Sequence, residues 1–122
     1  MINDKNKKVS VLLSVFNNKD TVEAAINSIL NQSYSNIELL ITDDFSEDSS
    51  YDICKLISKK DNRIKLFRNN TNLGLTKTLN IMLKASTGYY IARQDADDIS
   101  YLERIEKQIE ALEKNNFDVI YT

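Results

Sequence analysis

The side chains best suited to chemistry in this 122-residue chain are aspartates that directly follow short apolar runs. Asp95, Asp97 and Asp98 follow the run at 89–93. Two carboxylates held about 4 Å apart repel by roughly 4 kcal/mol at an effective dielectric near 20, so such a group favours a bound cation. Mg²⁺ binds one or two carboxylates together with phosphate oxygens, which suits a diphosphate ligand. This predicts a divalent-cation site, with one alternative left open: Asp97 or Asp98 can instead cap the next helix.

A second acidic pair, Asp43 and Asp44, follows the apolar run at 37–42. It is a weaker indication, because acidic pairs also occur in solvated turns. The chain has no histidine, which excludes histidine-based triads and histidine-containing zinc sites from these residues. Its two glycines, Gly74 and Gly88, supply neither the G-x-G-x-x-G turn of a dinucleotide site nor a Walker A loop. The chemistry therefore has to use carboxylates, hydroxyls or amides.

Short apolar runs alternate with helical patterns along the chain. We expect strands at 9–15, 37–42, 64–68 and 89–93, helices within 21–32, 48–57, 75–83 and 102–112, and a last short strand at 119–121. Asp20 and Glu23 predict a capping box at the first helix, Asp48 a cap on the second, and Gly88 the end of the third. This order predicts an α/β fold, a Rossmann-like, mostly parallel sheet flanked by helices.

The loops that follow the strands are where a ligand is expected in such a sheet. Three of them are polar: 16–18 after the first strand, 43–44 after the second and 95–98 after the fourth. Because parallel strands end at a common edge, we expect these three loops to lie together.

Composition and charge narrow the class of protein. Apolar residues make up 42% and charged residues 28% of the chain, typical of one soluble domain, and a net charge of -2 argues against a nucleic-acid partner. The single cysteine, Cys54, has no disulfide partner, and its neighbours Ile53, Leu56 and Ile57 place it on the apolar side of a helix. Residues 1–8 form a polar tail, and no apolar run approaches a membrane span. We expect a cytoplasmic protein whose full-length form can lie at the inner face of the membrane.

Five segments, in order, resemble the large second family of glycosyltransferases, which have the GT-A fold. They are Val9–Asn17, Ser28–Tyr34, Glu38–Asp48 with Asn69–Leu75, and Gly88–Asp98, the last with the Asp-x-Asp signature. The resemblance covers nearly the whole of 9–122 and implies the nucleotide-sugar-binding part of a metal-dependent, inverting glycosyltransferase. It also implies a UDP-sugar donor, a glycan or lipid-linked acceptor, and a role in cell-surface polysaccharide synthesis.

The resemblance also assigns roles. Asp44 would hydrogen-bond the nucleobase, Asp43 would support its loop, Phe16 would pack on the base and the main chain at Ser14 would contact it. Asp95 would face the ribose or donor sugar. For the cation, Mg²⁺ or Mn²⁺, the implied ligands are Asp97 and Asp98.

Some residues depart from the family pattern. The chain has no proline after the first strand, and Phe45 stands where the family often has glycine, so we expect a base-pocket loop of different shape. Core packing is the alternative for Phe16. Arg93 and Lys77 can approach phosphates, but cations near loops are usually solvated, and we assign them no role here.

The general base of an inverting transfer lies beyond the Asp-x-Asp loop in this family. Asp118 stands at the start of the last expected strand, at the wrong edge of the sheet, and Glu103 stands early in a helix. We therefore expect a truncated chain that binds donor but does not transfer sugar.

Two other functions remain as alternatives. A non-catalytic nucleotide-binding domain would show the same residues. A phosphoacceptor receiver domain would place its acidic pair after the first strand, where this chain has Phe16, Asn17 and Asn18.

Overall fold

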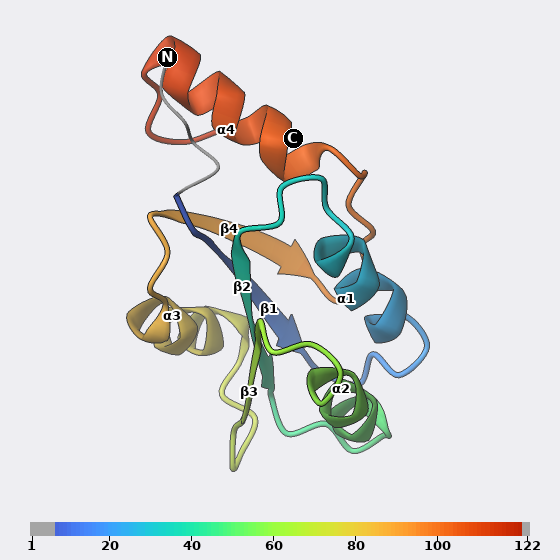
Figure 1. Ribbon diagram of the computed structural model, residues 1–122. Helices are drawn as coiled ribbons and strands as arrows, with labels where there is room; N and C mark the ends of the chain where they lie inside the picture. The colour runs from blue at the N-terminus through green and yellow to red at the C-terminus, as the bar shows by residue number, and fades with distance from the viewer. Residues whose placement is uncertain (1–6, 121–122) are drawn as a thin grey trace.

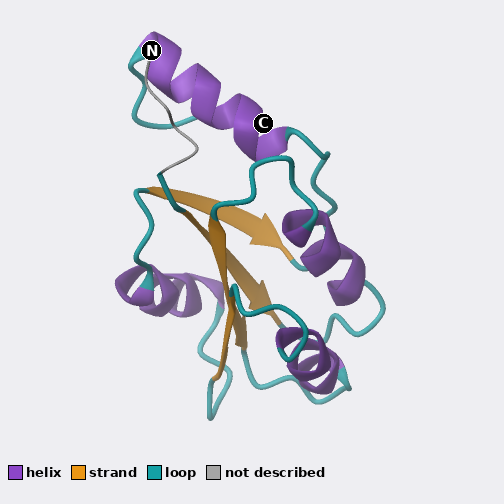
Figure 2. Ribbon diagram, viewed as in Figure 1, coloured by secondary structure: helices purple, strands orange, loops and turns teal. Residues whose placement is uncertain are grey.

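The computed structural model describes residues 7–120 as one parallel sheet with helices on both faces (Figure 1). The strands are β1 (Val9–Val15), β2 (Ile37–Asp43), β3 (Ile64–Arg68) and β4 (Tyr90–Asp95). The helices are α1 (Val22–Leu30), α2 (Ser50–Ser58), α3 (Leu75–Ala85) and α4 (Arg104–Asn115). The predicted alternation of strands and helices is confirmed, and Figure 2 shows the helices arranged around the strands.

The strand order is β3-β2-β1-β4, and every neighbouring pair is parallel. The register places Val15 opposite Asp43 and Ser14 opposite Asp95. The carboxyl ends of β1, β2 and β4 therefore lie side by side. This confirms the expectation that the three polar loops open at one edge of the sheet.

The two faces of the sheet bury different residues of the same strands. Val11, Leu13 and Leu39 belong to the main core, which also holds residues of α1, α2 and α4. Leu12 and Leu40 point to the opposite face and pack with Met82 of α3. This alternation explains why β1 and β2 read as continuous apolar runs, since both of their faces are covered.

Cys54 is buried in the main core, as predicted, although its neighbour Leu56 is exposed. Burial raises the pKa of the Cys54 thiol to about 12, and the nearby charge of Asp43 adds to this effect. The thiol therefore stays protonated and packs as a small apolar group. No helix in the described part of the chain is long and apolar enough to cross a membrane.

Two local predictions are wrong at helix ends. Helix α1 has no side-chain cap at Thr21, and the backbone N–H groups of Thr21 and Val22 instead donate to the Asn18 carbonyl, so the Asp20–Glu23 box does not form. Helix α3 ends at Ala85 with the extended residue Ser86, before Gly88 is reached.

The predicted last strand is also not found. Val119 and Ile120 lie outside any strand, and Tyr121 is outside the described residues. Helix α4 closes with the left-handed residue Asn116, and the short run after it pairs with no strand among residues 7–120. Asp118 therefore does not stand at the start of a strand.

Gly88 is required for a close approach instead. A Cβ atom there would lie 2.6 Å from both the backbone nitrogen and the Oγ of Ser10. The Gly88 N–H donates to Ser10 Oγ at 2.7 Å, and Ser10 Oγ donates to Glu38 at 2.5 Å. Glu38 also accepts from Lys65 Nζ at 2.8 Å and from the Thr87 N–H at 2.7 Å. These bonds join β1, β2, β3 and the start of β4 at the amino edge of the sheet.

Glu38 makes the stability of the fold depend on pH. Its burial alone would raise the pKa, but the hydrogen bonds from Lys65, Ser10 and Thr87 outweigh burial and lower the pKa from its ordinary 4.5 to about 2. Because the pKa is lower in the folded chain, the ionised group stabilises the fold above about pH 4.5, and this is lost as pH falls toward 2. A shift of this size corresponds to about 3 kcal/mol.

We predict that Glu38→Gln lowers the free energy of unfolding at pH 7 and flattens its decline between pH 4.5 and 2. Urea unfolding across this pH range measures both effects. Glu110→Gln, at an exposed position of α4, is the matched control. Equal pH profiles for the parent and Glu38→Gln would contradict the assignment.

Candidate functional site

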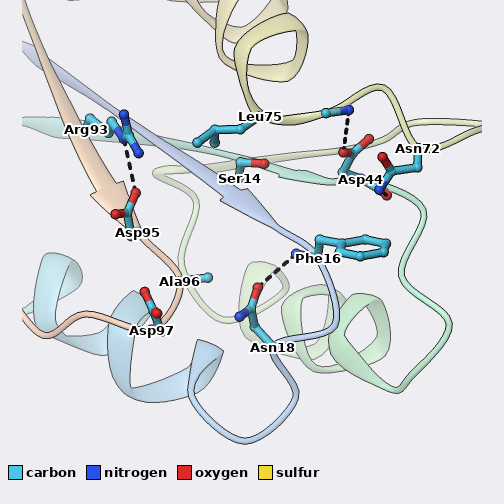
Figure 3. Close-up of a pocket in the computed structure, with 11 residues that line it drawn as sticks. Ser14, Phe16, Asn18, Asp44, Asn72, Leu75, Arg93, Asp95, Ala96 and Asp97 are labelled. Atoms are coloured by element: carbon cyan, nitrogen blue, oxygen red, sulfur yellow. Dashed lines mark hydrogen bonds and ion pairs between the residues drawn. The ribbon is translucent and has the colours of Figure 1, made fainter.

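A cleft of about 370 Å³ lies at the carboxyl edge of the sheet (Figure 3). It is lined by side chains from all three polar loops, from the start of α3 and from the end of β4: Ser14, Phe16, Asn18, Asp44, Asn72, Gly74, Leu75, Arg93, Asp95, Ala96 and Asp97. The cleft brings together five of the seven predicted site residues. The other two, Asp43 and Asp98, lie outside its lining.

The loops after β1 and β2 are bound to each other. The Asn17 N–H donates to Ser46 Oγ at 2.9 Å, and the Glu47 N–H donates to Asn17 Oδ1 at 2.8 Å. The Asn18 N–H donates to Ser50 Oγ at 2.8 Å. These bonds hold the loops without the proline that the family often has.

Phe16 lines the cleft with 43% of its surface exposed. This excludes core packing as its role. The turn that presents it continues through Asn17 in the left-handed conformation, with φ 52°. Phe45 in the neighbouring loop is also left-handed, with φ 65°, which accounts for the glycine often found there in the family. For a phenylalanine this conformation costs about 1–2 kcal/mol.

Asp44 joins the β2 loop to the start of α3. Its Oδ1 accepts from Asn69 Nδ2 at 2.9 Å and from the Leu73 N–H at 2.8 Å, and its Oδ2 accepts from the Gly74 N–H at 2.9 Å. A carboxylate has about four acceptor positions. Oδ2 therefore keeps one position for a further donor, such as an N–H group of a base.

Asp43 points away from the cleft. Its side chain is fully buried, its Oδ2 accepts from the Ser46 N–H at 2.9 Å, and Arg68 Nε lies 3.6 Å from the same atom. Its neighbour Asp44, the first residue after β2, lines the cleft. The geometry fits the predicted support of the loop and offers Asp43 no direct contact with a ligand in the cleft.

Asp95, Asp97 and Asp98 each place a carboxylate oxygen within 4.8 Å of the others. Asp95 is half-buried, and Asp97 and Asp98 are exposed. Helix α4 begins at Arg104 with no side-chain cap, so Asp97 and Asp98 do not cap it, and that alternative is wrong. Three converging hard oxygen donors fit a cation such as Mg²⁺ or Mn²⁺. The metal roles of Asp97 and Asp98 stay a prediction.

The end of α1 holds the acidic loop in place. Gln32 Nε2 donates to the Tyr101 carbonyl at 2.7 Å, and its Oε1 accepts from the Ile105 N–H at 3.0 Å. The Ser100 N–H donates to Ser28 Oγ at 3.0 Å. The segment Ser28–Tyr34, whose residues include no candidate for chemistry, thus positions the residues that are candidates.

Arg104 braces the same loop from below. It donates to Gln94 Oε1 and Ser100 Oγ, both at 3.1 Å, and to the Arg93 carbonyl at 2.9 Å. Burial lowers the pKa of the Arg104 guanidinium, and the charges of Asp95 and Asp98 oppose this shift. An arginine stays protonated in any case, so Arg104 supplies a fixed positive charge beneath the acidic loop.

Sequence reasoning missed several lining residues, among them Asn72, Leu75 and Arg93. Asn72 and Leu75 lie in a segment that the resemblance marked, but their place in the cleft depends on Asp44, which is distant in sequence. Arg93 lines the cleft although cations near loops are usually solvated, and the signal for this is its strand position two residues before Asp95.

The fold is the GT-A fold of solved glycosyltransferases. Residues 1–349 of S. aureus TarS match with a TM-score of 0.80 at 23% identity, over 89% of this chain and 33% of that one. The mannosyltransferase PcManGT of Pyrobaculum calidifontis, solved with GDP-Man and Mn²⁺, matches with a TM-score of 0.81 at 19% identity, over 92% of this chain and 34% of that one.

The sequence profile of glycosyl transferase family 2 matches residues 10–122, and the chain belongs to this family. EpsE of Bacillus subtilis, named as a glycosyltransferase, is 45% identical over 117 residues, which cover 94% of this chain and 42% of EpsE. WfgD of Escherichia coli, a UDP-Glc:alpha-D-GlcNAc-diphosphoundecaprenol beta-1,3-glucosyltransferase, is 38% identical over 113 residues, 93% of this chain and 44% of WfgD. The chain thus spans less than half the length of these relatives. The receiver-domain alternative is wrong.

We predict that Asp44→Ala frees the loop at 72–74. Leu73 and Gly74 lose the acceptor of their N–H groups, so we expect faster amide exchange there and a loss of about 1–3 kcal/mol in stability. Hydrogen exchange measures the first effect and urea unfolding the second. Asp52→Ala, at an exposed residue of α2, is the control. Unchanged exchange at Leu73 and Gly74 would show that Asp44 does not hold the loop.

Proposed function

We propose that this chain is the donor-binding part of a metal-dependent, inverting glycosyltransferase that uses a UDP-sugar. The observation that carries the proposal is the single cleft in which Phe16 and Asp44 lie with Asp95 and Asp97. An aromatic face and a carboxylate suit a nucleobase, and a group of carboxylates with a divalent cation suits a diphosphate.

The two halves of the cleft divide the donor between them. Phe16, Ser14 and the free position on Asp44 Oδ2 form a base pocket, in which the carboxylate accepts an N–H of the base. Asp95 faces the ribose or the sugar. A uracil offers one such N–H, and the name of the relative WfgD, with a UDP-Glc donor, supports the choice of uridine.

Asp97 would hold Mg²⁺ or Mn²⁺, with Asp98 sharing or supporting this role. A bound cation supplies positive charge where the departing nucleoside diphosphate gains negative charge, which is a general source of rate enhancement. Hydrogen bonds that involve Gln32, Ser28 and Arg104 fix the loop and thereby keep the carboxylates close together.

We propose that the acceptor site and the general base are formed by residues of the full-length protein outside this chain. The names of WfgD and of a second E. coli relative, WfaP, specify an acceptor linked to diphosphoundecaprenol, which supports a lipid-linked acceptor and synthesis of a cell-surface polysaccharide. A lipid-linked acceptor favours a position of the full-length protein at the inner face of the membrane. We propose that this chain alone binds donor and does not transfer sugar at an enzymatic rate.

Transfer by the full-length protein separates a glycosyltransferase from a non-catalytic nucleotide-binding domain. The full-length protein and this chain are each given UDP-glucose, Mn²⁺ and a lipid diphosphate-linked GlcNAc acceptor. We expect turnover only by the full-length protein, since a positioned general base contributes about 10² to 10⁴ in rate. Equal turnover by both would refute the division of roles, and binding of UDP without turnover by either would favour the non-catalytic domain.

We predict that Mn²⁺ strengthens UDP binding and that Asp97→Asn removes most of this gain. Removing a ligand charge should cost at least the roughly tenfold to hundredfold typical of residues that support metal ligands. Titration calorimetry with and without Mn²⁺ measures the gain for each protein. Asp118→Asn, an exposed aspartate outside the cleft, is the control. The same metal-dependent gain in Asp97→Asn and in the parent would remove Asp97 from the metal site.

A further inference from the structure

The lining of the cleft contains one positively charged side chain, that of Arg93, and three carboxylates, those of Asp44, Asp95 and Asp97. The nearest other arginine in sequence, Arg104, donates to Gln94, Ser100 and the Arg93 carbonyl and does not line the cleft. Arg93 is therefore the cationic side chain that an anionic ligand in this cleft can contact.

The register of β4 aims Arg93 and Asp95 at the same face. Arg93 lies opposite Leu12 and Asp95 opposite Ser14 on β1, so the two side chains are neighbours on the face covered by α3. Figure 3 shows Arg93 above Asp95 and beside Leu75, at the end of the cleft away from Phe16 and Asp44.

Only part of the Arg93 guanidinium is engaged. Its Nε donates to Asp95 Oδ1 at 3.0 Å, and its two Nη atoms have no hydrogen-bond partner within residues 7–120. The side chain of Arg93 is 53% exposed and that of Asp95 43% exposed. Ion pairs with this exposure contribute little to stability, so the pair is poorly explained as a support of the fold.

We propose that Arg93 binds a phosphate oxygen of the nucleoside diphosphate through its Nη groups while its Nε stays on Asp95. The proposal rests on the function proposed above and adds a residue to it. A guanidinium presents its N–H groups in a planar fork that matches two phosphate oxygens, and Asp95 fixes the orientation of this fork.

The negative charges at this end of the cleft favour a cationic side chain beside them. Asp95, Asp97 and Asp98 carry three negative charges, which by themselves repel a diphosphate. A divalent cation balances two of them, and the Arg93 guanidinium balances the third within the cleft. Arg104 adds a fixed charge from beneath the loop but makes its hydrogen bonds within the protein. Arg93 thus provides direct hydrogen bonds to the phosphates in addition to neutralisation.

Binding of UDP and of inorganic pyrophosphate tests the role, because pyrophosphate lacks the base. With Mn²⁺ present, Arg93→Gln should weaken both ligands by the same factor, about tenfold to hundredfold, as expected for charge-assisted hydrogen bonds. Arg93→Lys keeps the charge without the planar fork, so its affinity for both ligands should lie between those of the parent and Arg93→Gln. Lys84→Gln removes an exposed charge at the far end of α3 and should bind as the parent does.

Mn²⁺ binding without nucleotide, followed by electron paramagnetic resonance, separates phosphate binding from a structural role through Asp95. Arg93→Gln should keep or raise the Mn²⁺ affinity, because a positive charge has left the site. UDP affinity equal to that of the parent would overturn the role of Arg93. Mn²⁺ affinity reduced by the same factor as UDP affinity would overturn it too, because Arg93 would then act by orienting Asp95. A parent chain that binds neither UDP nor GDP with Mn²⁺ would instead overturn the proposed function itself.

Discussion

Parallel pairing of β1 with both β2 and β4 is the constraint on which the site depends. The pairing sets Ser14 opposite Asp95 and Val15 opposite Asp43, so the three polar loops leave the sheet at one level. A slip of one residue would turn every side chain of a strand to the other face. It would turn Arg93 and Asp95 toward the main core and bring Ala92 and Gln94 to the face of the cleft. The burial of Val11 and Leu13 on one face therefore also selects which polar side chains reach the ligand.

The segments between the strands act mainly as supports. Asp44 connects the loop after β2 to Leu73 and Gly74, the residues directly before α3. Gln32 connects the end of α1 to the loop after β4. Each of these side chains bonds backbone groups more than 25 residues away in sequence. A buried backbone group without a partner is costly, so such contacts hold each loop in one arrangement. This accounts for the presence of polar residues at fixed places in segments that have no chemistry of their own.

Much of the fold follows from the sequence because its signals are local. The run at 9–15 has the length and apolar content of a buried strand, and the structure places β1 at the same residues. The residues at one edge could be named because parallel strands share their carboxyl ends. Helix ends depend on more than the local pattern: a side-chain cap competes with other acceptors, and at α1 the Asn18 carbonyl occupies that place. The expected strand at 119–121 is different, because strand formation requires pairing with a residue distant in sequence, and Val119 and Ile120 pair with none of the four strands.

The orientation of single side chains in the site could not be read locally. Asp43 and Asp44 are adjacent and chemically alike, yet one is buried beside Ser46 and the other holds Leu73 and Gly74. The difference depends on where β2 ends, because Asp43 is its last residue and Asp44 already belongs to the loop. The same holds for Arg93, whose value to the cleft depends on its facing the same way as Asp95.

The strained and charged parts of the molecule lie at the same edge as the cleft. Asn17 and Phe45 take left-handed conformations in the two loops beside Phe16, and three carboxylates converge after β4. Neither feature helps the fold, since positive φ at a phenylalanine and like charges in proximity both cost free energy. The opposite edge is different, because there the Glu38 carboxylate is matched by Ser10, Lys65 and Thr87. An edge that is internally satisfied stabilises the sheet, whereas an edge left with open acceptors and free guanidinium N–H groups is completed by what it binds.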